Sequence, residues 1–302
     1  MSYLDLITIY REKNLIHLKS PAKINLFLRI LDKRKDGYHN LENLMQTINF
    51  CDEIEIAQKS VNDENIIFEC NEKNVPFGKE NIAVRAVMKY REITGIKNKV
   101  FLKLKKRIPV GGGLGGGSSN AGTVLLGLNI LNNNSLSIKK LTRVAIELGS
   151  DVPFFLHGGL ALCTGKGEVV TPMKSMELFH IVLVNPGFSI STKTAYENFE
   201  KKQLTRVNES AKVLKCGSIT YFKELIPVLH NDLEESVITQ YPLLREIKDY
   251  LEKCGCEKAM VTGSGSSIYG ICKEHNKAEE ISTDLRSRFG SRFLIITASN
   301  RV

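Results

Sequence analysis

Apolar and polar positions in the first half of the chain follow two different periods. In four segments the apolar residues alternate with polar ones or run together, which predicts β-strands; these are residues 16–31, 44–56, 66–70 and 100–104. Elsewhere the apolar residues return every three or four positions, which is typical of one buried helix face; these segments are 81–94, 121–131 and 141–148. Gly95 and Gly149 follow two of them, as a helix C-terminus favours. Residues 154–162 are strongly apolar and predict a further buried strand.

The second half mixes the same patterns in another order. Strands are predicted at 180–184 and 293–297, helices at 243–254 and 278–289, and further apolar segments within 259–272. Residues 193–217 are polar and show no clear period. Because strands and helices do not alternate strictly in either half, the pattern favours an α+β fold over a doubly wound α/β fold.

Length then suggests how these elements are divided. A chain of 302 residues exceeds the usual size of one domain. We therefore expect two domains that share a cleft, residues 1–172 and 173–302, with the boundary at Thr171-Pro172.

The net charge of +9 predicts an anionic partner, such as a phosphorylated small molecule, a nucleic acid or a membrane surface. Lysines and arginines are spread along the chain, and tryptophan is absent, which disfavours base stacking on single strands. No stretch of 18 apolar residues and no basic, apolar leader occurs, so neither a membrane span nor a secretory signal is expected. The seven cysteines form no disulfide framework or zinc set, which indicates reduced thiols and a cytoplasmic location.

The densest chemical signal is a run of glycines between a predicted strand and a predicted helix. Six of the seven residues from Gly111 to Gly117 are glycine, and Ser118 and Ser119 follow. Glycine permits positive φ, so successive backbone N–H groups can turn toward phosphate oxygens, and the helix N-terminus adds further donors. The two serine hydroxyls could cap the helix, bind phosphate or contact a metal ion. The alternative is a flexible linker, which the flanking strand and amphipathic helix disfavour.

Two familiar nucleotide motifs fit this loop poorly. Gly111, Gly113 and Gly116 match G-x-G-x-x-G, but no acidic residue occurs between Ser118 and Ile146 to hold a ribose. The outline of a P-loop is present too, but no lysine precedes the serine. A cation that neutralises the phosphates must therefore come from another segment.

Lys23 and Asp151 are the candidates for charge and proton transfer. Lys23 is a lone cation among apolar strand residues, and Asn25 lies on the same face two residues later. Asp151 follows a helix end in Gly-Ser-Asp-Val-Pro. Alone, the lysine could be a solvated surface residue and the aspartate a turn cap. Together with the loop they supply what phosphoryl transfer to an alcohol requires, which is a phosphate cradle, a cation and a carboxylate.

A second loop of small residues, Gly263-Ser264-Gly265-Ser266-Ser267, lies between two apolar segments. It could be an ordinary tight turn. It could also be a second wall of the active site, because small residues allow backbone to approach a ligand closely.

Three of these segments together resemble the GHMP kinase superfamily: Pro-Ala-Lys-Ile-Asn-Leu from Pro21, the loop Pro109–Ser119, and Thr-Gly-Ser-Gly from Thr262. Three more resemble the branch that phosphorylates a cytidine diphosphate-linked polyol in the non-mevalonate isoprenoid pathway: Gly37-Tyr38-His39, Gly149 to Pro153, and Asn185 to Thr192. The resemblance covers residues 18–300. Residues 1–17 and the segment 201–217 have no counterpart in it.

The resemblance implies a two-domain α+β kinase with ATP and substrate in the cleft between domains. It implies Lys23 and Asp151 as the catalytic pair. The ATP phosphates would be bound by Pro109, Val110, Gly111, Gly112, Gly113, Leu114, Gly115, Gly116, Gly117, Ser118 and Ser119, with Lys106 and Asn81 as nucleotide contacts. The substrate would be held by Asn25, Tyr38, His39, Asp151, Tyr196, Gly263 and Ser264, with the aromatic residues on the cytosine.

The same resemblance implies ATP and Mg²⁺ as cofactors. Ser119 is a candidate metal contact, and no acidic metal ligand is assigned. We expect a monomer or weak homodimer that binds neither nucleic acid nor membrane. Another GHMP kinase, acting on homoserine or mevalonate, is the nearest alternative; the Tyr38-His39 pair argues against it because such a pair suits a planar base. A basic nucleic-acid-binding module is the alternative from another class.

Overall fold

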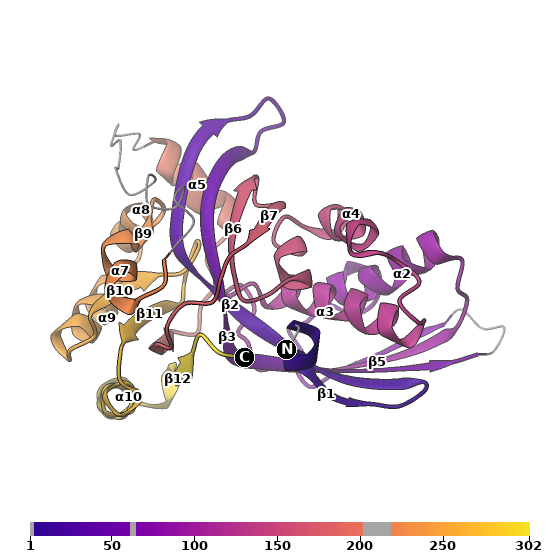
Figure 1. Ribbon diagram of the computed structural model, residues 1–302. Coiled ribbons are helices and arrows are strands. Elements are labelled where there is room, and N and C mark those ends of the chain that lie inside the picture. Colours follow the sequence, from indigo (N-terminus) through magenta and orange to yellow (C-terminus); the bar gives the residue numbers. More distant parts are fainter. Residues whose placement is uncertain (1–2, 61–64, 202–218) are drawn as a thin grey trace.

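The computed structural model describes residues 3–60, 65–201 and 219–302 and shows two sheets with helices on them (Figure 1). The first part of the chain runs through α1 (Tyr3–Ile7), β1 (Thr8–Arg11), β2 (Leu15–Lys33), β3 (His39–Lys59), β4 (Ile66–Cys70), α2 (Ile82–Thr94), β5 (Lys99–Lys105), α3 (Gly116–Leu131), α4 (Ile138–Leu148), β6 (Leu160–Gly165) and β7 (Val169–Pro172). The second part runs through β8 (His180–Asn185), α5 (Thr192–Lys201), α7 (Phe222–Leu225), β9 (His230–Asn231), α8 (Glu234–Gln240), α9 (Pro242–Lys253), β10 (Lys258–Val261), β11 (Ile268–Cys272), α10 (His275–Phe289) and β12 (Leu294–Ser299).

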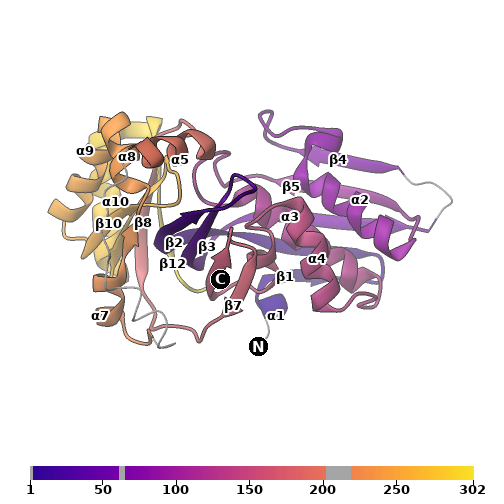
Figure 2. The ribbon, with the colours of Figure 1, turned by 90° about the horizontal axis from the view of Figure 1, so that it is seen from above.

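The long hairpin of β2 and β3 joins the two halves of the molecule (Figures 1 and 2). The larger sheet has the order β1-β2-β3-β5-β4, with β6 on β3, β7 on β6 and β9 on β2. The register of β2 against β3 shifts between Pro21 and Lys23 and again between Asn25 and Phe27. Lys23 and Asn25 therefore lie in a short paired stretch between two irregularities, the first of which follows Pro21, a residue without an N–H for the ladder.

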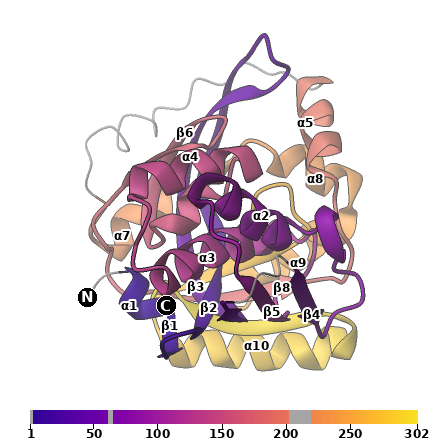
Figure 3. The same ribbon diagram turned by 90° about the vertical axis from the view of Figure 1, so that its right-hand side faces the viewer.

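Helices α2, α3 and α4 cover one face of the larger sheet and close the first core (Figures 1 and 3). α4 buries one stripe, Leu141, Val144, Ala145 and Leu148, as its apolar period predicts. α3 is instead buried along nearly its whole length, because it lies between the sheet and the other two helices. Its N-terminus is thereby fixed against β2 and β3, which positions the loop that precedes it.

The smaller sheet has the order β10-β11-β8-β12, with all neighbours antiparallel. Residues of α9 and α10 pack on it around Leu244, Ile247, Leu251, Ile281 and Leu285. A further core, which includes Phe27, Phe179 and Tyr269, joins the two sheets. The α+β fold expected from the sequence is therefore confirmed, while the boundary after residue 172 stays a prediction.

The strand predicted for residues 154–162 was wrong over its first part, and two segments had no prediction. Residues 153–156 form a 3-10 turn, and β6 begins only at Leu160, because Gly158 and Gly159 turn the chain with φ of +59° and +65°. The polar stretch 193–217 begins as helix α5, and its residues 202–217 lie outside the described residues. The segment without a counterpart, 1–17, includes β1, which extends the larger sheet beside β2.

Two expectations about membranes and thiols can be compared with the structure. Among the described residues, no helix has both the length and the apolar character needed to cross a membrane. The six cysteines in the described part of the chain are all free thiols.

Candidate active site

The glycine-rich loop adopts a conformation that few other residues could take. Gly111, Gly113 and Gly115 have φ of +70°, +77° and +68°, and Gly115 is the N-cap of α3. A Cβ on Gly113 would lie 2.3 Å from the carbonyl oxygen of Thr262, so the loop also needs glycine for space. The first turn of α3 leaves backbone N–H groups without intrahelical partners, and they lie beside the loop. The loop and helix start together have the features of an anion site.

A cleft of about 570 Å³ lies in front of this loop and is lined from both halves of the chain. Its volume suits small-molecule ligands. Most of the predicted site residues line it: Lys23, Asn25, Asn81, Lys106, Pro109 to Ser118, Asp151, Tyr196, Gly263 and Ser264. Tyr38, His39 and Ser119 are not among the lining residues.

Lys23 forms the buried cationic floor of the cleft. Its Nζ donates to Asn25 Oδ1 at 2.6 Å and to the Gly113 carbonyl at 3.0 Å, and lies 3.9 Å from Asp151 Oδ2. Desolvation lowers the pKa of this ammonium, and the nearby Asp151 charge opposes that effect. The lysine is therefore held between the loop and the carboxylate.

Asp151 reaches the cleft from the turn after α4. Its side chain is 31% exposed, in contrast to the buried Lys23. The partial exposure leaves room for a hydroxyl group to approach the carboxylate. Lys23 and Asp151, 128 positions apart in the sequence, therefore form one ion pair beside the loop.

The amide of Asn25 is fixed by residues that sequence reasoning missed. Asn25 Nδ2 donates to Asn43 Oδ1 at 2.8 Å, and Asn25 Oδ1 accepts from Thr262 Oγ1 at 3.0 Å. Tyr269 donates to the Asn25 carbonyl at 2.8 Å. Oδ1 is engaged by Lys23 and Thr262, and Asn43 takes one N–H of Nδ2, so the second N–H of Nδ2 is the group left for a ligand. Asn43 itself lines the cleft, and its position on β3 gave no sequence signal beyond that of a polar strand residue.

The aromatic residues form a different part of the site. Tyr38 lies in the turn between β2 and β3 and is 57% exposed, and Lys166 Nζ lies 4.9 Å from its ring centroid. The His39 and Tyr196 rings stack at 5.4 Å. Lys166 and Tyr196 line the cleft, so Tyr38 and His39 adjoin it through these partners. Lys166 was not predicted; it is one of many lysines in the sequence, and only the fold brings it to the tyrosine.

Asn81, Lys106 and Ser119 have hydrogen-bond partners within the protein. Asn81 caps α2, since its Oδ1 accepts from the N–H groups of Ala83 and Val84 at 2.8 and 3.4 Å. Lys106 Nζ forms an ion pair with the buried Asp52. Ser119 is fully buried, with its Oγ 2.8 Å from Ser20 Oγ. The first two reach the cleft wall, whereas Ser119 anchors the helix start.

The second small-residue loop is a wall of the cleft that contacts the first loop. The Ser267 N–H donates to the Gly112 carbonyl at 3.2 Å, and Ser264 Oγ lies 3.2 Å from Thr192 Oγ1. Gly263 and Ser264 line the cleft directly. The loop is therefore not an isolated tight turn. Its small residues bring its backbone close to the glycine-rich loop and to the cleft.

Comparisons with known proteins agree with this arrangement. Residues 81–159 match the family "GHMP kinases N terminal domain", and residues 208–291 match "GHMP kinases C terminal". The 4-diphosphocytidyl-2-C-methyl-D-erythritol kinase of Desulfotalea psychrophila is 37% identical over 289 residues, which cover 94% of this chain and 95% of that protein. The kinase of the same name from Geobacter metallireducens is 39% identical over 264 residues, covering 86% and 90%.

Solved structures give the same result. A crystal structure of 4-(cytidine 5'-diphospho)-2C-methyl-D-erythritol kinase matches with a TM-score of 0.75 and 30% identity, covering 93% of this chain and 98% of that one. A homoserine kinase from Cytophaga hutchinsonii matches with a TM-score of 0.72 at 18% identity, over 96% of both chains, and so shares the fold.

Proposed function

This chain belongs to the 4-diphosphocytidyl-2-C-methyl-D-erythritol kinase family of GHMP kinases, and we propose that it transfers the γ-phosphoryl group of ATP to the 2-hydroxyl of that substrate. The products are ADP and the phosphorylated polyol of the non-mevalonate isoprenoid pathway. The observation that carries the proposal is the meeting of Lys23, Asp151 and the glycine-rich loop in one cleft.

In the proposed mechanism Asp151 orients the attacking hydroxyl and accepts its proton. The hydroxyl oxygen forms the new bond to the γ-phosphorus while the bond between that phosphorus and the ADP oxygen breaks. Lys23, 3.9 Å from the carboxylate, stabilises the negative charge that develops on the transferring group. The loop amides and the start of α3 hold the remaining phosphates.

Mg²⁺ is proposed as the partner of the ATP phosphates, whose charge it would neutralise. The described residues contain no group of three or more His, Cys, Asp or Glu that could hold a metal ion. This fits a magnesium ion held mainly by phosphate oxygens and water with one or two carboxylates. Asp151 and Glu80 are the acidic residues that line the cleft.

The cytidine part of the substrate is assigned to the aromatic wall. Tyr38, His39 and Tyr196 offer ring faces for a planar base, and partial burial raises the pKa of Tyr196, which keeps it a hydrogen-bond donor. Lys166 lies between this wall and the cleft, where its ammonium group would bind the diphosphate. Asn25, Gly263 and Ser264 complete the substrate side.

We further propose a cytoplasmic enzyme that acts as a monomer or weak homodimer. The free thiols of the described cysteines support a reducing compartment. Neither nucleic acid nor membrane is needed as a partner, since the phosphates of ATP and substrate account for the basic charge at the site.

A coupled assay that follows ADP release tests the proposal. Purified protein with Mg²⁺ and ATP should release ADP only when 4-diphosphocytidyl-2-C-methyl-D-erythritol is added. Homoserine and mevalonate serve as matched alternative alcohols. ADP release that is independent of the cytidyl substrate, or greater with either alternative, would contradict it.

A further inference from the structure

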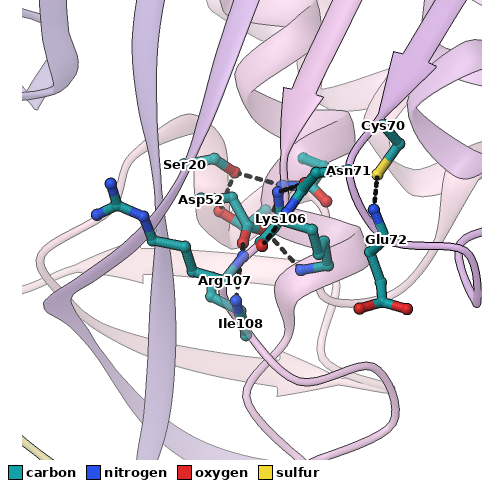
Figure 4. A network of polar contacts seen from close by, with 10 residues as sticks. Ser20, Asp52, Cys70, Asn71, Glu72, Lys106, Arg107 and Ile108 are labelled. Carbon is teal, nitrogen blue, oxygen red and sulfur yellow. Dashed lines mark hydrogen bonds and ion pairs between the residues drawn. The ribbon is translucent and has the colours of Figure 1, made fainter.

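Both ends of the glycine-rich loop are tied to one pair of residues on the β2–β3 hairpin (Figure 4). Ser20 and Asp52 are direct cross-strand partners, and both side chains have an exposed fraction of 0%. The chain enters the loop from β5 through residues 106–108 and leaves it at the start of α3, where Ser119 and Asn120 lie. Together, Ser20 and Asp52 contact both the segment that enters the loop and the segment that leaves it.

The Asp52 carboxylate accepts hydrogen bonds at all of its acceptor positions. Its Oδ1 accepts from the backbone N–H groups of Arg107 and Ile108 at 2.7 and 2.8 Å. Its Oδ2 accepts from Lys106 Nζ and, at 2.8 Å, from Asn120 Nδ2. A carboxylate offers about four such positions, so this one has no acceptor capacity left for a ligand.

Neighbouring residues complete the link between strand and helix. Ser20 Oγ accepts from Asn120 Nδ2 at 2.9 Å and lies 2.8 Å from Ser119 Oγ. The Lys106 backbone N–H donates to Asn71 Oδ1 at 2.6 Å, and its carbonyl accepts from Asn71 Nδ2 at 3.1 Å. A Cβ on Gly116 would lie 2.8 Å from Lys106 Nζ, so the ammonium group lies against the helix start.

We propose that Asp52 is a positioning residue for ATP, and the proposal rests on the function given above. It sets the separation between Lys106 and the first turn of α3, so that the loop amides and the lysine converge on the same phosphates. Asp52 does not line the cleft and acts through these groups. Because the donors are held in place before ATP arrives, binding need not order them, and the lost entropy is smaller.

A purely structural role would have different consequences. If Asp52 only stabilised the core, its loss would reduce the amount of folded enzyme and would affect ATP and cytidyl substrate alike. If it positions the ATP loop, the affinity for ATP falls selectively. The two ligands therefore distinguish the two roles.

The test is isothermal titration of wild type and Asp52→Asn with a non-hydrolysable ATP analogue plus Mg²⁺, and separately with cytidine diphosphate. An asparagine amide must direct its NH₂ group at donors, either Arg107 and Ile108 or Lys106 and Asn120, so two donors lose their acceptor. We expect the Kd for the ATP analogue to rise at least about tenfold, or about 1.4 kcal/mol, and the Kd for cytidine diphosphate to change less than about twofold. Folded Asp52→Asn with an unchanged Kd for the ATP analogue, or with equal losses for both ligands, overturns the proposal.

The matched control is Asn129→Ala, at the other end of α3. Asn129 is also buried, and its side chain bonds the N–H and carbonyl of Leu136 at 2.9 and 3.0 Å. This variant should lose stability while both Kd values stay at wild-type level. A selective loss of ATP affinity here would mean that any disturbance of α3 has the effect, and would overturn the assignment to Asp52.

If Asp52→Asn does not fold, the Asn120→Ala variant tests the positioning role in its place. It removes the two bonds from Asn120 Nδ2 to Ser20 and Asp52 and leaves the bonds of Arg107, Ile108 and Lys106 in place, so a selective rise in the ATP-analogue Kd of about threefold or more is expected. An unchanged Kd overturns the proposal. A wild-type protein that binds neither ligand would instead contradict the proposed function itself, so the two failures are distinguishable.

Discussion

The two walls of the cleft are built in opposite ways. On the side that we propose for ATP, the polar groups in and behind the wall are buried and joined to one another, as Asp52, Asn120 and Ser20 illustrate. On the side that we propose for the substrate, the rings are exposed or half-buried and make contacts through stacking and a cation, as Tyr38 and Lys166 illustrate. Triphosphate recognition depends on backbone amides in fixed positions, whereas a base can be stacked by side chains that adjust. We therefore expect side-chain changes on the proposed ATP side to affect both stability and binding, and side-chain changes on the proposed substrate side to affect binding alone, whereas glycine substitutions also change backbone strain.

The largest effect is expected at Asp151, where the two walls meet. Asp151→Asn removes the proton acceptor and keeps the shape, so kcat should fall about 10²–10⁴-fold. The Kd values for ATP and cytidine diphosphate should remain near wild type, which titration calorimetry measures. Undiminished turnover would eliminate the assigned role.

Lys23 gives the next largest effect and a signature in the pH profile. Lys23→Ala should lower kcat about 10²–10³-fold, because a group that stabilises charge in the transition state is lost. Burial lowers the pKa of the Lys23 ammonium, so the charge, and with it wild-type activity, should be lost as pH rises through a value below the usual lysine range.

Lys23→Arg is the control for this loss of activity at high pH, the alkaline limb of the pH profile. A guanidinium group stays protonated, so this variant should lose the limb even if its rate is lower. The measurement is kcat from pH 6 to pH 11 for both proteins. An unchanged limb in the arginine variant would assign the titration to another group.

A pair of glycine substitutions compares the two walls directly. Gly113→Ala forces a Cβ to 2.3 Å from the Thr262 carbonyl oxygen at a φ of +77°, so we expect unfolding free energy to fall by about 2 kcal/mol or more and KM for ATP to rise. Gly37→Ala has a φ of +84° but nothing within 4 Å of the new Cβ, so only about 1–2 kcal/mol of backbone strain is expected, with both KM values near wild type.

Urea unfolding and steady-state kinetics measure this pair. The contrast between the walls would be lost if Gly37→Ala raised KM for ATP as much as Gly113→Ala.

The smallest effect is expected at Tyr38 on the substrate wall. Tyr38→Ala removes one stacking face, worth about 1–3 kcal/mol per base, so KM for the cytidyl substrate should rise about fivefold or more. KM for ATP and the free energy of unfolding should not change, because the ring is exposed. Tyr10→Ala, an exposed tyrosine on β1, is the control that should alter neither KM. An equal rise in KM for ATP would show that the two walls are not separable.

The sequence by itself predicted most of the elements, and it led to the proposal of a phosphate site at the glycine run. Helices α2 and α4 begin and end close to the predicted positions because their apolar periods are regular and Gly95 and Gly149 end them. The glycine run was readable because backbone conformation is a local property that glycine alone satisfies. The strand predicted for 154–162 was wrong over 154–159, because an apolar run does not distinguish a strand from a buried turn.

The tertiary structure decided which distant residues share the site. No pattern in the sequence indicated that Asp52 accepts from both ends of the loop, that Asn43 orients Asn25, or that Lys166 lies over Tyr38. Each of these contacts joins residues that lie on different elements, and their separation depends on the twist of the β2–β3 hairpin and on how α3 packs against it. The conformational preference of a residue depends mainly on its own type and on its neighbours in the sequence. Its contacts with residues distant in the sequence form only when the hydrophobic core packs. The burial of apolar surface, and not the polar contact itself, sets the distance between the two residues.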